Sequence, residues 1–248
     1  MNLIFLTAAG VGGATVIGAI IGFIFIKTTE KYADTVISFA AGVMLATSVF
    51  NLIIPSLNNE YKYRILISVA GIFCGSLCIT VLDGFIERII KHKNLIPNES
   101  SKNLHAILLF VSAIAIHNFP EGIAAGIGFG TDNIADALII AGSIAIQNLP
   151  EGMVIISPML SVGISRSKTF IIAVFTGIIE IIGTLFGYYA ITVSNEILPF
   201  ALSFAGGTMI YVICGDMIPE TQSEHRKQSS TYALISGFIL MLILNEII

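Results

Sequence analysis

The stretch "IAIHNFPEGIA" at residues 114–124 places a histidine, an asparagine, a proline and a glutamate inside a run that is otherwise apolar enough to span a membrane. A second copy, "IAIQNLPEGMV" at 144–154, matches it at seven of eleven positions. Because only the short turn around "GTDNIAD" joins the two runs, the helices that carry the copies must run antiparallel. Many transporters build a substrate site from inverted repeats with interrupted helices near the middle of the bilayer.

The rest of the chain also has the composition of a membrane protein. Of its 248 residues 55% are hydrophobic and 11% are charged, and the mean hydropathy of +0.91 lies far above that of a soluble domain. We therefore expect an all-α integral membrane protein, with residues 1–248 forming one transmembrane domain. Eight apolar runs reach the roughly 20 residues that a membrane-crossing helix needs. They lie near 3–26, 34–56, 64–88, 104–128, 134–160, 169–193, 198–219 and 230–247.

Lysine and arginine residues predict the orientation, because basic loops are retained in the cytoplasm. Of the twelve, only Lys62 and Arg64 lie in loops that follow even-numbered runs. The other ten follow runs one, three, five and seven: Lys27, Lys31, Arg88, Lys91, Lys93, Lys102, Arg166, Lys168, Arg226 and Lys227. Both termini are therefore expected on the extracytoplasmic side, with a cytoplasmic loop at about 89–103. The simple chain suggests a multi-pass protein of a bacterial inner membrane.

Two other kinds of protein are disfavoured by the sequence. With a net charge of −4 and no basic patch, the chain lacks the positive surface that nucleic-acid binding requires. Its three cysteines lie within apolar runs, which argues against a disulfide framework. Cys74 and Cys78 lie one helical turn apart and could bind a soft metal, but a packing role is favoured.

Polar side chains of three runs are expected to meet at one depth in the membrane. His117 and Glu121 are four residues apart and share a helix face, and Gln147 and Glu151 repeat this spacing. Glu180 lies near the centre of the sixth run. The full candidate set is His117, Asn118, Glu121, Gln147, Asn148, Glu151 and Glu180.

A divalent metal ion would explain why these groups are tolerated in hydrocarbon. An ionised group at the centre of the bilayer costs about 2.5–3.5 kcal/mol, and neighbouring carboxylates repel one another. Imidazole and amide oxygens beside the carboxylates favour Zn²⁺ first, then Fe²⁺, Mn²⁺ or Cd²⁺. Pro120 and Pro150 donate no N–H, so each frees the carbonyl four residues earlier for a cation. Gly122 and Gly152 leave room for close helix approach or for an ion.

At these residues the sequence resembles the ZIP family of zinc and iron-regulated metal transporters, and the resemblance covers essentially the whole chain. Gln147 in place of a histidine resembles the bacterial GufA-like branch. The resemblance implies import of a divalent metal ion into the cytoplasm through a midplane site that can hold two ions, with the metal as substrate and no cofactor. It assigns the transport site to His117, Glu121, Gln147, Glu151 and Glu180, and a second position to Asn118 and Asn148, which share the glutamates.

The resemblance also implies a homodimer that works by alternating access. In chain order, helices 2, 3, 7 and 8 would form a frame, and helices 1, 4, 5 and 6 would move as a transport unit. The small-residue run "GVGGATVIGAIIG" in the first span suits close helix contacts and sliding surfaces.

Two further groups of residues are candidates for the ends of the pathway. Asp83, Asp216, Glu220 and His225 are expected near the cytoplasmic face, where they could receive the leaving ion or form ordinary salt-bridged helix ends. Met44, Ser48 and Asn51 share a helical spacing in the outer half of the second span. They could line an entrance, although core packing explains them equally well.

Two other functions remain open at this point. An intramembrane metal-dependent hydrolase would also need His and Glu at depth, but the chain has no HExxH pair. A proton-coupled transporter of organic cations could use the carboxylates as a proton relay, although it would not need the amide and histidine ligands.

Overall fold

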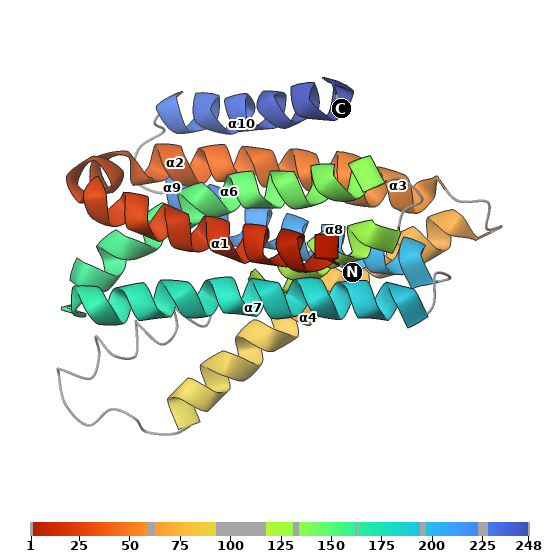
Figure 1. Cartoon of the computed structure of the whole chain (residues 1–248), viewed down its shortest axis with the longest axis horizontal. Helices are drawn as coiled ribbons and strands as arrows, with labels where there is room; N and C mark the ends of the chain where they lie inside the picture. Colours follow the sequence, from red (N-terminus) through yellow and green to blue (C-terminus); the bar gives the residue numbers. More distant parts are fainter. Residues whose placement is uncertain are drawn as a thin grey trace.

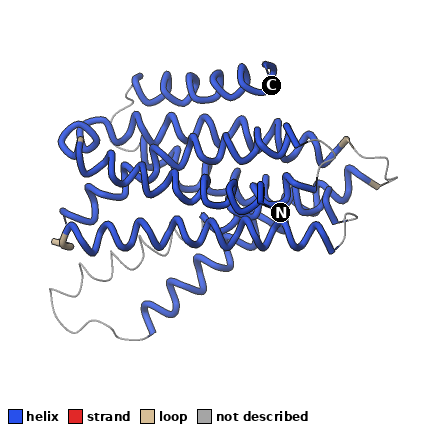
Figure 2. Tube along the Cα trace, in the orientation of Figure 1, coloured by secondary structure: helices blue, strands red, loops and turns tan. Residues whose placement is uncertain are grey.

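The computed structural model describes residues 2–58, 63–92, 118–130, 134–161, 163–193, 197–222 and 228–247, and within these the backbone is helical apart from short turns (Figure 2). The described elements are α1 (Asn2–Ile24), α2 (Ile26–Ala46), η1 (Thr47–Ile53), α3 (Ile54–Leu57), α4 (Arg64–His92), η2 (Gly128–Gly130), α6 (Ile134–Ser161), α7 (Arg166–Val193), α8 (Leu198–Val212), η4 (Ile213–Met217), α9 (Ile218–Gln222) and α10 (Gln228–Ile247). Residues 118–127 are also helical.

Seven described helices are long and apolar enough to cross a membrane, which confirms an all-helical integral membrane protein. They coincide with seven of the predicted spans, the second being α2 with η1 and α3, and the seventh α8 with η4 and α9. Of the fourth predicted span, 104–128, only the part from residue 118 onward is described. The helix α4 continues to His92, into the loop predicted at about 89–103, whose remaining residues lie outside the described ones. No proline or glycine interrupts "ERIIKH", and its basic residues favour a helix C-terminus.

Most helices lie along a common axis, and the N-terminal end of α1 is at the same end of the bundle as the C-terminal end of α10 (Figure 1). One group of helices contains α1, α6, α7 and residues 118–127: α1 packs against both α6 and α7, and Gly122 meets the backbone of α7. In the rest of the bundle α2 packs on α10 and α4 packs on α8, while α2 also contacts α6 and so joins the two parts.

Reciprocal glycine contacts bring the helix backbones close together. A Cβ at Gly12 would lie 2.2 Å from the carbonyl oxygen of Gly177, and a Cβ at Gly177 would lie 2.4 Å from that of Gly12. Gly42 and Gly237 join α2 to α10 in the same way, against the carbonyls of Leu234 and Phe39. Only residues without a side chain permit this approach, which is common where membrane helices associate.

Two spans contain a π-helical turn, and α6 continues through Pro150, the proline of the second motif copy. The turns are η1, at Thr47–Ile53, and η4, at Ile213–Met217, and such turns are frequent at functional sites. The break predicted at Pro150 is not seen, because α6 is one helix from Ile134 to Ser161. A proline removes one hydrogen bond, and packing by neighbouring helices can hold the turn together around it.

Candidate metal site

The polar residues of the repeated motif are buried at the centre of the first group of helices. Asn118 and Glu121 are 1% exposed, and Gln147, Asn148 and Glu180 are fully buried. We refer to these five residues as the central cluster. Glu151 is half-buried on α6. His117 lies outside the described residues.

The glycines that follow each Pro-Glu pair seat the two motif copies against neighbouring helices. A Cβ at Gly122 would lie 2.3 Å from the carbonyl oxygen of Glu180 on α7. A Cβ at Gly152 would lie 2.1 Å from the carbonyl oxygen of Thr15 on α1. Each motif glycine thus packs against the backbone of a residue whose side chain enters the site. Because Glu121 and Glu151 directly precede these glycines, the same contacts fix the positions of the two glutamates.

One side of the central cluster is held by hydrogen bonds. Thr15 donates its hydroxyl to Oε2 of Glu180 at 2.7 Å. The Nδ2 group of Asn148 donates to the other carboxylate oxygen, Oε1, and also to the carbonyl oxygen of Val11 at 3.2 Å. The Glu180 carboxylate is therefore oriented from two helices, α1 and α6, besides its own.

The other side of the cluster consists of buried polar atoms that the described protein leaves without hydrogen bonds. Both oxygens of Glu121, both amide atoms of Asn118 and Gln147, and Oδ1 of Asn148 have no partner among the described residues. Gln147 lies beside Glu121 and Asn118 beside Glu180, but neither pair meets hydrogen-bond geometry. A buried polar atom without a partner costs about 1–3 kcal/mol, so a concentration of them indicates a place for a ligand that the protein itself does not supply.

The donor set determines which ligand fits. The charges of Glu151 and Glu180 are close enough to act on Glu121. Within the described ranges, however, no three His, Cys, Asp or Glu side chains gather closely enough to hold one metal ion by themselves. Carboxylate oxygens together with amide oxygens suit a cation that accepts mixed oxygen ligands, so the amides must be counted among the candidate ligands.

The predicted exit residues are only partly described. Asp216 is exposed within η4, at the end of the seventh span. Asp83 lies on α4 and Glu220 on α9, but their side chains, like the whole of His225, lie outside what the structure describes.

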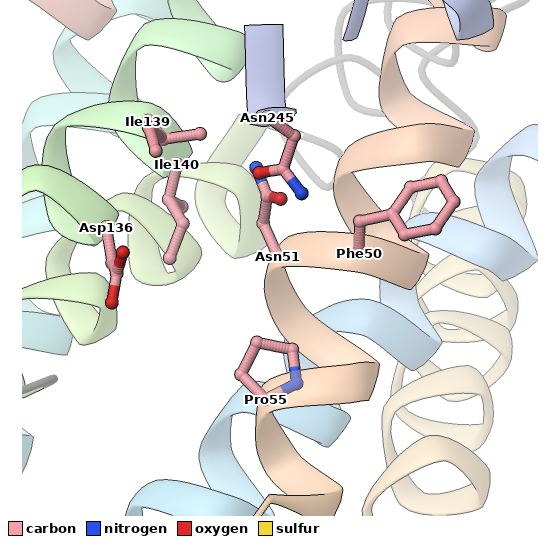
Figure 3. Close-up of a pocket in the computed structure, with 7 residues that line it drawn as sticks. All are labelled: Phe50, Asn51, Pro55, Asp136, Ile139, Ile140 and Asn245. Atoms are coloured by element: carbon pink, nitrogen blue, oxygen red, sulfur yellow. The ribbon is translucent and has the colours of Figure 1, made fainter. Parts of the chain in front are cut away.

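The predicted entrance coincides in part with a cavity of about 260 Å³ near the end of the bundle that holds both chain termini. Figure 3 shows its lining side chains, contributed by η1, α3, α6 and α10: Phe50, Asn51, Pro55, Asp136, Ile139, Ile140 and Asn245. Asn51 is 5% exposed, and its Nδ2 group has no partner in the described part of the chain. Met44 and Ser48 do not line this cavity.

The other two predicted entrance residues, Met44 and Ser48, are packed in the interior of the described protein. Met44 belongs to the same buried apolar cluster as Ile140 and Ile144 of α6. Ser48 is fully buried and donates its hydroxyl to the carbonyl of Leu45 in its own span. Of the three predicted entrance residues, Met44 and Ser48 therefore pack in the interior, and Asn51 lines the cavity.

Sequence reasoning missed one residue of the site, Thr15. The sequence places it in a run of small residues suited to helix contacts, and its hydroxyl gains the Glu180 carboxylate as partner only once α1 packs on α7. The available signal was a single hydroxyl residue in the middle of an apolar span, flanked by Gly12 and Gly18.

Comparison with known proteins identifies relatives over nearly the full chain. A family model described as ZIP Zinc transporter matches residues 96–245. The zinc transporter GufA of Myxococcus xanthus is 32% identical over 94% of this chain and 94% of its own length. The zinc transporter ZupT of Lysinibacillus sphaericus is 32% identical over 94% of this chain and 92% of its own. The zinc transporter ZIPB of Bordetella bronchiseptica is 30% identical over 94% of this chain and 77% of its own.

Proposed function

Because the chain belongs to the ZIP zinc transporter family, we propose that the central cluster is the site through which it imports divalent metal ions, with Zn²⁺ as the first substrate. Divalent metal ion import follows from family membership. The relatives are named zinc transporters, so the chain is a transporter rather than an enzyme, and the metal is substrate rather than cofactor. A bacterial inner membrane fits the bacterial relatives.

The observation that carries the proposal is the set of buried polar atoms of Asn118, Glu121 and Gln147 that have no hydrogen-bond partner in the described protein. A metal ion would supply the missing interactions of the oxygen atoms in this set. Glu151, Glu180 and His117 complete the proposed ligand set, with Asn118 and Asn148 available to a second ion. The carbonyl of Ile146, which Pro150 deprives of its helical donor, is a further oxygen at this level.

A proton-coupled transporter of organic cations would use fewer of the buried polar groups. Carboxylates alone would serve as a proton relay, so the buried amides would remain without a role. The amide oxygens of Asn118 and of Gln147 instead match a ligand that binds several oxygens at once. The hydrolase alternative is set aside by the family of the chain.

Movement of one helix group against the other would give alternating access. The proposed transport unit is α1, α6, α7 and the helix that contains 118–127. Its support is the glycine-mediated backbone contact within each group, as between Gly12 and Gly177 or between Gly42 and α10. We expect the N- and C-termini on the extracytoplasmic side, so the ion would enter by the cavity at Asn51 and leave toward Asp216 and Glu220.

The homodimer implied by the resemblance is also part of the proposal. The helices α4 and α10 each expose a row of large apolar side chains, among them Phe73, Leu77, Ile239 and Ile243. In a membrane, lipid or a second subunit would cover these faces.

Uptake of radioactive zinc into proteoliposomes that contain the purified protein tests the function directly. We expect saturable uptake, with Fe²⁺, Mn²⁺ and Cd²⁺ added as competitors to supply the order of preference. Empty liposomes measure the leak. No saturable uptake of any of these ions by a monodisperse, folded protein would contradict the proposal.

Uptake is expected to weaken severalfold as the external pH falls from about 7.5 to about 5. Metal binding requires ionised carboxylates and a neutral imidazole, so protons compete with the metal for the central cluster and for His117. The measurement is initial zinc uptake with the internal pH held constant, and a zinc ionophore in protein-free liposomes serves as control. A flat profile over this range would argue against competition at these ligands.

Replacing Asn51 by alanine is expected to lower the uptake rate about fivefold, since one lost hydrogen bond to the passing hydrated ion costs about 1 kcal/mol. Equilibrium zinc binding to the detergent-solubilised protein should not change, because Asn51 lies in the outer cavity. Asn58→Ala is the matched control, since Asn58 is exposed near the same end of the span. If Asn51→Ala also lost equilibrium zinc binding, Asn51 would act on the binding site and not only on entry through the outer cavity.

A further inference from the structure

The first and sixth spans share a glycine pattern centred on the two residues that meet in the site. Residues 12–22 read G-x-x-T-x-x-G-x-x-x-G, and residues 177–187 read G-x-x-E-x-x-G-x-x-x-G. Thr15 and Glu180 occupy the same position in this pattern. The recurrence is independent of the repeated motif at 114–124 and 144–154, because it lies on different helices.

The contacts made by these glycines follow the same correspondence. Gly12 and Gly177, three residues before Thr15 and Glu180, pack against each other's carbonyl oxygens. The later glycines of each pattern pack against equivalent residues of the two motif copies. Their carbonyl partners are Leu149 for Gly18 and Phe119 for Gly183, then Met153 for Gly22 and Ile123 for Gly187.

The motif glycines complete the arrangement from the other side. Gly122 packs against the carbonyl of Glu180, and its counterpart Gly152 packs against the carbonyl of Thr15. Thr15 therefore stands to the second motif copy as Glu180 stands to the first. The two side chains meet between the copies through the hydrogen bond from the Thr15 hydroxyl to Oε2 of Glu180.

We infer that Thr15 is a positioning residue of the metal site, which acts by holding the carboxylate of Glu180 through its hydroxyl. This inference rests on the proposed function of the central cluster. With Thr15 on Oε2 and Asn148 on Oε1, each oxygen of Glu180 keeps a lone pair for an ion. The carboxylate is fixed before the ion arrives, whereas Glu121 has no such restraint among the described residues.

This arrangement predicts that Thr15 affects affinity for the ion more than the maximal rate. Thr15→Val keeps the branched shape of the side chain and removes the donor. We expect the KM for zinc uptake and the Kd for zinc binding to rise about tenfold, the effect of one lost hydrogen bond to a charged group, with the maximal rate within about twofold of wild type. Thr15→Ser retains the hydroxyl and should restore both constants to within about twofold.

Thr208→Val is the matched control for the loss of a buried threonine hydroxyl. Thr208 is 1% exposed on α8, and its hydroxyl donates only to the carbonyl of Ala205 among the hydrogen bonds described, at 2.7 Å. A tenfold change in KM in this variant as well would show that the effect is general destabilisation, and would overturn the inference. If Thr15→Val does not give a monodisperse protein, Thr15→Ala removes the same hydroxyl without adding bulk.

A double-mutant cycle with Glu180→Gln then tests whether Thr15 acts through Glu180. In that background, adding Thr15→Val should change zinc binding less than about twofold, since the carboxylate that it positions is gone. An independent tenfold loss would overturn the inference. If Glu121→Ala loses all uptake while Thr15→Val keeps the wild-type KM and Kd, only the role of Thr15 is overturned. If Glu121→Ala instead keeps full uptake, the proposed site itself is contradicted.

Discussion

Replacing Glu121 by alanine is expected to abolish zinc uptake into proteoliposomes and to weaken zinc binding by at least about 100-fold. Loss of a residue that only supports a metal ligand costs about 10- to 100-fold in affinity, and Glu121 is proposed as a ligand shared by both ion positions. Glu151→Ala is expected to have the same effect on uptake. Initial uptake rate and equilibrium zinc binding, both per folded protein, are the measurements.

The same substitution should not destabilise the metal-free protein. Neither carboxylate oxygen of Glu121 has a hydrogen-bond partner among the described residues, so alanine removes a buried polar group without leaving a donor behind. We expect the melting temperature of Glu121→Ala to equal or exceed that of wild type. Glu180→Ala should lower it, because the donors of Thr15 and Asn148 would lose their acceptor.

Glu246 supplies the matched control for this prediction. It is exposed near the end of α10, so Glu246→Ala should change neither uptake nor melting temperature. If Glu121→Ala transports zinc at the wild-type rate, the central cluster is not on the transport path. If it loses uptake only because the protein unfolds, the fall in melting temperature will reveal it.

The opposite responses expected for Glu121 and Glu180 describe a compromise between stability and function. Sites that bind a charged ligand keep polar groups that a stable core would exclude. Here Glu180 is supported by α1 and α6, and Glu121 remains available for the ion. The proposed metal site therefore has a fixed side and an open side, in keeping with a substrate that must bind and leave.

The positions of the spans were predictable because hydropathy alone determines which segments can lie in a membrane. The predicted span 134–160 and the observed α6, Ile134–Ser161, differ by one residue at the C-terminal end. The π-helical turns η1 and η4 were not predictable, since they depend on how neighbouring helices pack around one extra residue per turn. For the same reason the sequence could not show that Asn51 borders a cavity while Ser48, three residues earlier, is enclosed.

The candidate site was predictable as a set of residue types but not as a network. The spacing of Glu121, Gln147 and Glu180 within their spans indicated a common depth, and all three are buried in the structure. It did not indicate which carboxylate is hydrogen-bonded, because Thr15 lies over a hundred residues from Glu180 in the chain. The shared glycine pattern around Thr15 and Glu180 was present in the sequence, and it becomes interpretable once the contact partners of the glycines are known.

Replacing Gly152 by alanine is expected to lower the melting temperature by about 10 °C and to abolish zinc uptake. The added Cβ would lie 2.1 Å from the carbonyl oxygen of Thr15, a distance that backbone atoms cannot accommodate without a shift of α1 against α6. Overpacking of this kind costs about 3 kcal/mol. The shift would also pull the Thr15 hydroxyl away from Glu180, so structure and site should fail together.

Gly142→Ala provides the control on the same helix, because nothing lies within 4 Å of a Cβ built at Gly142. Alanine is the better helix former by about 1 kcal/mol, so this variant should melt at or above the wild-type temperature and transport zinc normally. Equal losses in both variants would mean that α6 needs glycine flexibility rather than close packing. Selective loss in Gly152→Ala would instead tie the glycine of the repeated motif to the contact that brings α1, and with it Thr15, into the metal site.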